Sequence, residues 1–315
     1  MSTAADAVTD PFPLAFPIID AHQHFWDLTR NYHPWLRDEP PIPFRYGDYQ
    51  ALKRNYLPDD YRADSQAHTI VGTVYMEAEW NPADPLGETR WLEQLQAASG
   101  LPTAAVAQAW LDRDDVAAVL AAQAQSPLVR GIRHKPTAAA SAAEIQPGAP
   151  GSMSDPRWRA GYALLQEYGL SFDLQTPYWH LYEAAELAAE FPKITMIINH
   201  TGLPAERNPI ALNQWRSALR AVAELPNTAL KISGLGVPGK PWRLTDNHDI
   251  ILDAIALFGV ERCMFASNFP VDSLCGSFDT IFSGFKQAVA DFDPAEQQLL
   301  FHDNAVRIYR LDEGE

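Results

Sequence analysis

The stretch IIDAHQHFW, residues 18–26, carries two histidines one residue apart, directly after a short apolar run. The run Phe16–Ala21 is the first of eight short segments rich in apolar and β-branched residues, and it predicts a β-strand. Residues spaced by two lie on one face of an extended segment, so Asp20, His22 and His24 are expected to point to the same side. Whether the two histidines hold a metal ion, serve a reaction without one, or only pack depends on partners supplied by the rest of the chain.

Seven further candidate strands alternate with segments of helical periodicity. The predicted strands are Thr69–Met76, Thr103–Trp110, Leu128–Ile132, Leu170–Leu174, Ile194–Asn199, Thr228–Ile232 and Arg262–Ala266. The predicted helices are Gly87–Ala98, Arg113–Gln125, Pro156–Tyr168, Trp179–Glu190, Pro209–Glu224, Asp246–Phe258, Phe278–Asp291 and Pro294–Ile308. Eight such units over about 290 residues favour an α/β fold of the (β/α)8 TIM barrel type over an open doubly wound sheet. No Gly-x-Gly-x-x-Gly follows the first strand, so we expect no dinucleotide or other organic cofactor.

The chain shows no linker that would divide it. We therefore expect a single barrel domain over residues 16–315, preceded by a flexible tail at residues 1–15, where nothing buries enough surface to stay ordered. An insertion rich in aromatic residues and proline runs from Gln23 to Tyr61, between the first two strands. Loops this long in compact domains are usually lids or binding loops, and we expect the same of this one.

Composition limits the class of partner. The formal net charge of -16 repels phosphate backbones and anionic membrane surfaces, and no apolar run reaches the roughly 18 residues of a membrane span. We therefore expect a small-molecule substrate and neither nucleic acid nor membrane as partner; a homo-oligomer stays open. Only two cysteines occur, Cys263 and Cys275, and the start of the chain lacks a secretory signal, which together favour the cytoplasm.

Polar residues recur where six of the predicted strands end, which is where the catalytic groups of TIM barrels lie. They are His22 and His24 after the first strand, Glu77 after the second, Arg133 and His134 after the fourth, Gln175 after the fifth, His200 after the sixth, and Asn268 with Asp272 after the eighth. Each alone has an ordinary explanation, such as a packed histidine or an ion pair at the rim. Their coincidence at one end of the barrel predicts a common pocket.

Short motifs run in order from Ile18 to about Val271. They are IDAHQHFW, PWL, NYLPDDY, GETRWL, VRGIRH, FDLQ, NHTGLP, KISGL and RCMFASNFPV. Together these motifs resemble the amidohydrolase superfamily, and more closely its branch of sugar-lactone and 2-pyrone-4,6-dicarboxylate lactonases. The resemblance covers most of the chain. It implies a TIM-barrel hydrolase of carbohydrate metabolism, often metal-dependent, with its site at the carboxyl ends of the strands.

The resemblance also implies a set of metal ligands. His22, His24 and His200 match family ligands on strands one and six, and they are the candidate ligands of a divalent metal such as zinc. Gln175 stands where strand five would supply a histidine, and Asn268 where strand eight would supply an aspartate. Because an amide cannot act as a general base, two alternatives stay open: a weakly bound zinc ion, or a metal-independent reaction.

The predicted reaction is the hydrolysis of a small cyclic ester such as a sugar lactone. His22, His24 and His200 would surround the carbonyl oxygen, directly or through a metal. Asn268 would position the water, and Asp272, four residues further on, is the leading candidate for the base in its place.

The remaining polar and aromatic residues are candidates for substrate binding. Arg133 suits bidentate contacts to a carboxylate or hydroxyls, while Glu77, His134 and Gln175 would orient the substrate and Trp26 or Trp80 would wall a sugar face. Two other functions stay open. One is a non-hydrolytic lyase or isomerase of the same superfamily, either a decarboxylase or a lactone isomerase, and the other is a binding protein on a decayed enzyme scaffold.

Overall fold

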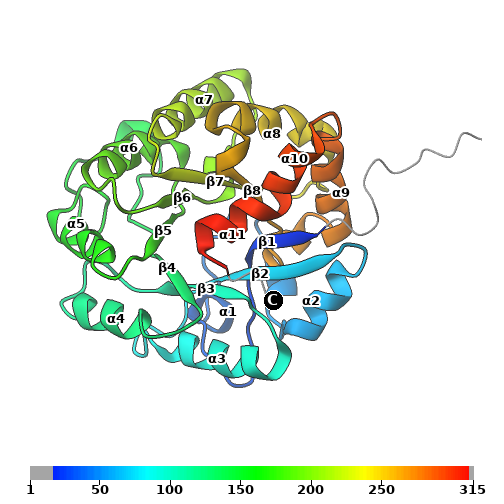
Figure 1. The fold of residues 1–315 in the computed structure, drawn as a ribbon. Helices are drawn as coiled ribbons and strands as arrows, with labels where there is room; N and C mark the ends of the chain where they lie inside the picture. Colours follow the sequence, from blue (N-terminus) through cyan, green and yellow to red (C-terminus); the bar gives the residue numbers. More distant parts are fainter. Residues whose placement is uncertain (1–16, 312–315) are drawn as a thin grey trace, which may run out of the picture.

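In a computed structural model, which describes residues 17–311, eight strands form one sheet in which each strand is parallel to the next and the order follows the sequence (Figure 1). The strands are β1 (Ile18–Gln23), β2 (Ile70–Met76), β3 (Ala104–Gln108), β4 (Val129–Arg133), β5 (Ser171–Leu174), β6 (Met196–Ile198), β7 (Thr228–Ile232) and β8 (Cys263–Phe265). The segment after β8 joins β1, because the His24 N–H donates to the Phe269 carbonyl and the Asn268 N–H to the His22 carbonyl, both at 2.8 Å. The predicted (β/α)8 TIM barrel is confirmed.

Helices surround the sheet (Figure 1). Those between the strands are α3 (Gly87–Ser99), α4 (Val116–Gln123), α5 (Pro156–Ala163), α6 (Leu181–Glu190), α7 (Pro209–Ala223), α8 (Leu244–Phe258), with α9 (Phe278–Ala288) after β8. Single 3-10 turns lie at Gln50–Leu52, Ala142–Glu144, Leu164–Gln166, Tyr178–His180, His200–Gly202, Val260–Arg262 and Val271–Leu274. Helix starts follow local chemistry: α5 and α7 begin with proline, directly after Asp155 and Asn208, whose side chains accept from backbone N–H groups of the first turn.

The predicted helix Pro294–Ile308 is interrupted. It consists of α10 (Pro294–Gln298), a π-helical turn over Leu299–Asp303 and α11 (Asn304–Tyr309). Helix α11 packs on the apolar residues inside the barrel and crosses the barrel in Figure 1. The Arg310 side chain donates to the Arg130 carbonyl beside the start of β4, so the C-terminal segment covers the amino-terminal end of the barrel.

Apart from the start of β2, where Val71 is exposed, the strands are buried on both faces, because one set of alternating side chains points into the barrel and the other packs against the helices. Val74, Met76 and Val106 belong to the cluster inside the barrel, while Tyr75 and Phe172 belong to the cluster shared with the surrounding helices. This double burial explains why the strands are continuous apolar runs rather than alternating ones. Polar side chains inside the barrel are therefore exceptions to this apolar pattern.

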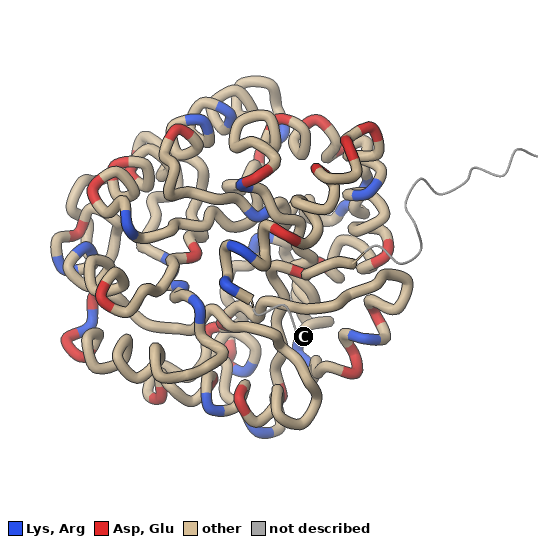
Figure 2. The backbone as a smooth tube through the Cα atoms, in the orientation of Figure 1, with Lys and Arg blue, Asp and Glu red and all other residues tan. Residues whose placement is uncertain are grey.

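Two of these polar groups form a buried ion pair. Lys231 on β7 and Asp173 on β5 are fully buried, with Nζ 2.7 Å from Oδ1, and the Tyr309 hydroxyl of α11 donates to the same carboxylate at 2.9 Å. On the outside, acidic and basic residues are interspersed over the ring of helices (Figure 2). Within residues 17–311, no helix is long and apolar enough to cross a membrane.

The insertion between β1 and β2 is compact and contains the helices α1 (Pro34–Arg37) and α2 (Pro58–Ser65). Trp35 and Phe44 stack with ring centroids 5.6 Å apart and an interplanar angle of 6°. Sequence patterning did not predict these helices because α1 has only four residues and α2 contains few apolar residues from which a helical period could be recognised. The insertion thereby presents aromatic side chains to the mouth of the barrel.

Candidate active site

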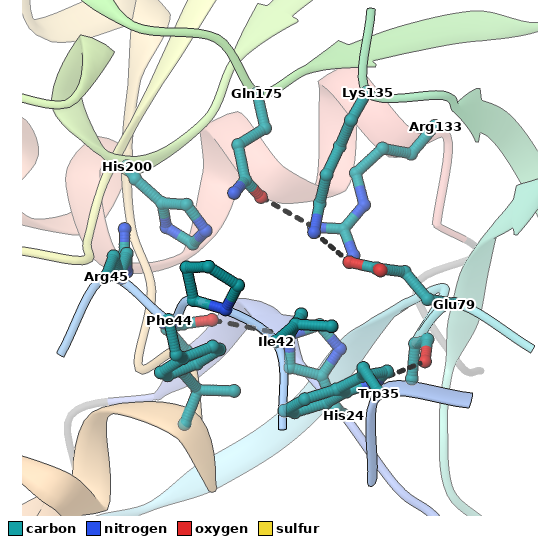
Figure 3. Close-up of a pocket in the computed structure, with 14 residues that line it drawn as sticks. His24, Trp35, Ile42, Phe44, Arg45, Glu79, Arg133, Lys135, Gln175 and His200 are labelled. Carbon is teal, nitrogen blue, oxygen red and sulfur yellow. Dashed lines mark hydrogen bonds and ion pairs between the residues drawn. The ribbon is translucent and has the colours of Figure 1, made fainter. Parts of the chain in front are cut away.

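A cavity of about 200 Å³ lies at the carboxyl ends of the strands (Figure 3). Residues that follow strands line one part of it: His24, Ala78, Glu79, Arg133, Lys135, Gln175, His200, Asn268 and Val271. The insertion supplies the rest: Trp35, Ile42, Pro43, Phe44 and Arg45. Side chains expected from the sequence to share a pocket thus meet here from β1, β4, β5, β6 and β8.

Three histidines form the centre of the site. The Nε2 atoms of His22 and His24 lie 3.3 Å apart, and the His22 and His200 ring centroids lie 4.6 Å apart. Burial, aided by nearby cations such as Lys231 beside His22, holds the pKa of all three well below the usual value for histidine. The imidazoles are therefore uncharged at neutral pH and keep lone pairs for a proton or a metal.

The hydrogen bonds of His24 fix its tautomer. Its Nδ1 lies 2.8 Å from the Met76 carbonyl, which can only accept, so Nδ1 carries the proton and Nε2 carries a lone pair. That Nε2 lies 3.3 Å from Oδ1 of Asn268, whose Nδ2 donates to Asp272 at 2.6 Å. Two acceptors, one from His24 and one from Asn268, thus face each other at the cavity, an arrangement suited to a group that donates protons to both, such as water.

Asp272 lies behind Asn268 and does not line the cavity. Its Oδ1 accepts from Asn268, from the Tyr46 hydroxyl at 2.9 Å and from Arg45 at 3.3 Å. Burial raises the pKa of this carboxyl. Three donors therefore meet at Oδ1 of Asp272, one of them Asn268, so this carboxylate is placed to orient Asn268, and its part as the base stays a prediction.

The guanidinium of Arg133 makes more hydrogen bonds within the protein than the sequence suggested. Its Nε donates to Glu77 Oε1 at 2.5 Å, a second nitrogen donates to the Glu77 carbonyl, and the third reaches Gln175 Oε1 at 3.2 Å. Glu77 therefore fixes the guanidinium through two hydrogen bonds, and Gln175 accepts a hydrogen bond from the edge of the guanidinium at the cavity. Any contact of Arg133 with substrate is made by the N–H groups left at that edge.

Backbone strain concentrates at the site. Glu79, His200 and Asn268, which follow β2, β6 and β8, have φ of 55°, 54° and 55°. This left-handed region is rare for residues other than glycine, though asparagine and histidine tolerate it better than most. Such conformations gather at functional sites, where the fold holds them in place, and here they belong to three residues that line the cavity.

Two residues of the first strand and loop lie elsewhere than expected. The pairing of β1 with β2 is irregular between Asp20 and Gln23, and the Asp20 carboxylate accepts from Ser267, Tyr61 and the His22 backbone N–H rather than from the histidine rings. Burial raises its pKa to about 6. Trp26 is fully buried and lines no cavity, since its Nε1 donates to the Arg54 carbonyl at 2.7 Å, so it packs rather than walling the substrate.

Several residues that line the cavity were not predicted from the sequence. Lys135 and Glu79 each lie two residues beyond a predicted site residue, Arg133 and Glu77. A spacing of two places side chains on the same side of an extended segment, and this is the sequence pattern that could have indicated them. Trp35, Phe44 and Arg45 come from the insertion, whose path over the mouth depends on its own packing. Trp80, His134 and Glu77 line a neighbouring cavity.

The fit of these residues to a metal ion is partial. The Nδ1–H bond of His24 to a carbonyl and the approach of its Nε2 to that of His22 suit two ligands of one ion. In the part of the chain that the structure describes, however, no group of three or more His, Cys, Asp or Glu side chains is placed to hold a metal. His22 and His24 are the donors that converge, and His200 stands beside them.

A (β/α)8 barrel with polar side chains gathered at the carboxyl ends of its strands has the architecture of the TIM-barrel enzymes. The model of the amidohydrolase family matches residues 19–311, and the chain belongs to this family, as the motifs predicted. An uncharacterized protein, y4mH, from Sinorhizobium fredii is 40% identical over 93% of this chain and 98% of its own. L-fucono-1,5-lactonase from Burkholderia multivorans is 28% identical, over 94% and 96%. The crystal structure of an amidohydrolase from Burkholderia multivorans with bound zinc superposes with a TM-score of 0.76 at 27% identity, over 94% and 99%.

Proposed function

We propose that this protein hydrolyses a lactone of the size of a sugar acid at the mouth of its barrel. The observation that carries the proposal is the His24–Asn268 pair, in which a neutral imidazole with a fixed tautomer faces an amide oxygen beside an open cavity. Likeness to L-fucono-1,5-lactonase over nearly the full length supports the same reaction type. The amidohydrolase family supports hydrolysis as the class of chemistry.

In this mechanism a water donates one hydrogen bond to His24 Nε2 and the other to Asn268 Oδ1. His24 takes a proton as the water oxygen bonds to the lactone carbonyl carbon. The negative charge that develops on the carbonyl oxygen is stabilised by the cations at the cavity, Arg45 and Arg133. The ring C–O bond then breaks, and the departing alkoxide takes the proton from His24, which leaves a hydroxy acid.

The histidines also suit a divalent cation held by His22 and His24 with His200 beside them. When bound, such an ion would polarise the carbonyl and acidify the water. Asn268, Asp272 and Arg133 keep the same tasks in either case, because each positions or neutralises without losing a proton.

The test is a panel of aldono-1,4- and aldono-1,5-lactones, including L-fucono-1,5-lactone, followed by proton release and by NMR of the product. The expected product is the ring-opened acid, formed above the spontaneous rate. Metal analysis of the purified protein and assays with a chelator then separate the two versions of the mechanism. Formation of CO2 or of an isomerised ring, or no turnover of any lactone, would overturn the proposal.

A further inference from the structure

A second cavity, of about 330 Å³, adjoins the first. Trp35, Glu79, Arg133 and Lys135 line both, so they form the wall between the two. Figure 3 shows these four side chains around the first cavity. Within this wall Lys135 and Glu79 form an ion pair, and their side chains are 39% and 43% exposed. Ion pairs this exposed contribute little and rearrange easily. The Lys135–Glu79 contact is therefore the part of the wall that a ligand reaching into both cavities would displace at least cost.

Aromatic rings form the apolar part of the second cavity. Trp80 and Trp110 line it together with Trp35. Trp80 is nearly buried and stacks on Trp91 with centroids 6.2 Å apart, so its ring is held in place. Tryptophan faces of this kind contribute large contact area at low conformational cost.

Directional hydrogen-bonding groups complete the cavity. His134 Nδ1 accepts from the Leu111 N–H at 3.0 Å and from the Trp158 indole N–H at 3.1 Å, so the proton of the neutral ring must lie on Nε2. Burial lowers the pKa of His134, which keeps the ring neutral. Gln108 adds a buried amide whose contact with the Trp80 carbonyl is long, at 3.4 Å. Donors from His134 and Gln108 and acceptors from the carboxylate of Glu79 thus line the same cavity.

We propose that the second cavity is a subsite for a second hydroxylated ring, so that the preferred substrate is an aldonolactone carrying a glycosyl group. Flat aromatic walls suit the C–H faces of a sugar ring, and fixed donors and acceptors suit its hydroxyls. The lactone ring occupies the first cavity beside His24 and Asn268, and the glycosidic link crosses the wall at Lys135 and Glu79. This subsite rests on the proposed lactone hydrolysis and adds the size and chemistry of the substrate.

The experiment compares kcat/KM for glucono-1,5-lactone with that for lactobiono-1,5-lactone and maltobiono-1,5-lactone. The disaccharide-derived lactones are expected to be at least about tenfold better for the wild type, and Trp110→Ala to remove most of that advantage. The single-ring lactone should change less than about twofold in Trp110→Ala, because Trp110 does not line the first cavity. Trp179→Ala is the matched control, since Trp179 is a partly buried tryptophan that lines neither cavity.

Binding of the products gives a readout that does not depend on turnover. Lactobionate is expected to bind the wild type more tightly than gluconate in calorimetry, and Trp110→Ala should abolish the difference. Equal affinities, or a single-ring lactone that is turned over as well as the larger ones, would overturn the subsite while leaving lactone hydrolysis intact. Preference for a lactone with an unsubstituted phenyl ring would overturn the assignment to a sugar. Failure to open any lactone would overturn the proposed function, and the product affinities would still decide the subsite.

Discussion

Lys231 inside the barrel and the histidines at its mouth are buried alike, but only the lysine has an opposite charge beside it. The Asp173 carboxylate, which also accepts from the Tyr309 hydroxyl of α11, balances the ammonium of Lys231. At the mouth, burial removes the charge instead, and His24 Nε2 keeps a lone pair that faces the Asn268 oxygen and His22 Nε2, both at 3.3 Å, rather than a charged partner. Removing one partner of a buried ion pair leaves an uncompensated charge and destabilises the fold, whereas an uncharged group with a lone pair is available for chemistry.

Replacing His24 tests the chemical half of this comparison and has the largest expected effect. His24→Gln should lower kcat by about 10²- to 10⁴-fold, because it removes the proton acceptor, with little change in the fold by circular dichroism. His33→Gln is the matched control: His33 is also buried with Nδ1 on a carbonyl, that of Ala78, but it lines neither cavity. Equal losses of kcat in the two variants would show that His24 only packs.

Breaking the ion pair tests the structural half. Lys231→Met leaves Asp173 charged and unpaired in the interior, so the free energy of unfolding should fall by about 3–5 kcal/mol in denaturant titrations. The double variant Lys231→Met with Asp173→Asn carries no buried charge and should recover part of that loss. A double variant less stable than the single variant would show that the loss in Lys231→Met does not come from an unpaired charge on Asp173.

Asn268→Asp introduces a charge into the uncharged mouth. The new carboxylate would lie against Asp272, since the two side chains are 2.6 Å apart in the wild type, and like charges at this distance share a proton. We expect a new ionisation in the pH profile of kcat, with activity reduced roughly tenfold or more on one side of it. Exchanging the two groups, in Asn268→Asp with Asp272→Asn, should remove that ionisation; its persistence would argue against the contact.

Tyr46→Phe should have the smallest effect. It removes one of the donors to Asp272 and leaves Asn268 bonded, so kcat should fall by about two- to tenfold, the equivalent of one hydrogen bond. Tyr49→Phe in the same insertion is the control, because the Tyr49 hydroxyl donates to the Trp35 carbonyl away from Asp272. A larger loss of kcat in Tyr49→Phe than in Tyr46→Phe would show that the effect comes from the insertion as a whole and not from the hydrogen bond to Asp272.

The strands and the main residues of the mouth could be predicted because both depend on local pattern. Apolar runs mark strands buried on two faces, and the barrel places whatever follows them at one end, which is how His24, Arg133, Gln175, His200 and Asn268 were found together. Strand limits agree within a few residues, as in β7, where the predicted and observed limits coincide at Thr228–Ile232.

The remainder depends on contacts that no local pattern contains. An irregular register turns Asp20 away from the histidines, and packing within the insertion buries Trp26 while bringing Arg45 to the mouth. Lys231 follows apolar residues in its strand, and its partner Asp173 lies 58 positions earlier, so neither could be paired from sequence alone.

The central claim, that an uncharged histidine at the mouth is the base, is tested most directly by the pH dependence of kcat/KM for lactone hydrolysis. Burial penalises the imidazolium, so the pKa of His24 is lowered and the base form persists to lower pH than for an exposed histidine. The expected profile is flat from pH 8 down through pH 6.5 and falls only below that, and His24→Gln abolishes the falling limb. A limb centred at or above pH 6.5, or one unchanged in His24→Gln, would contradict the account.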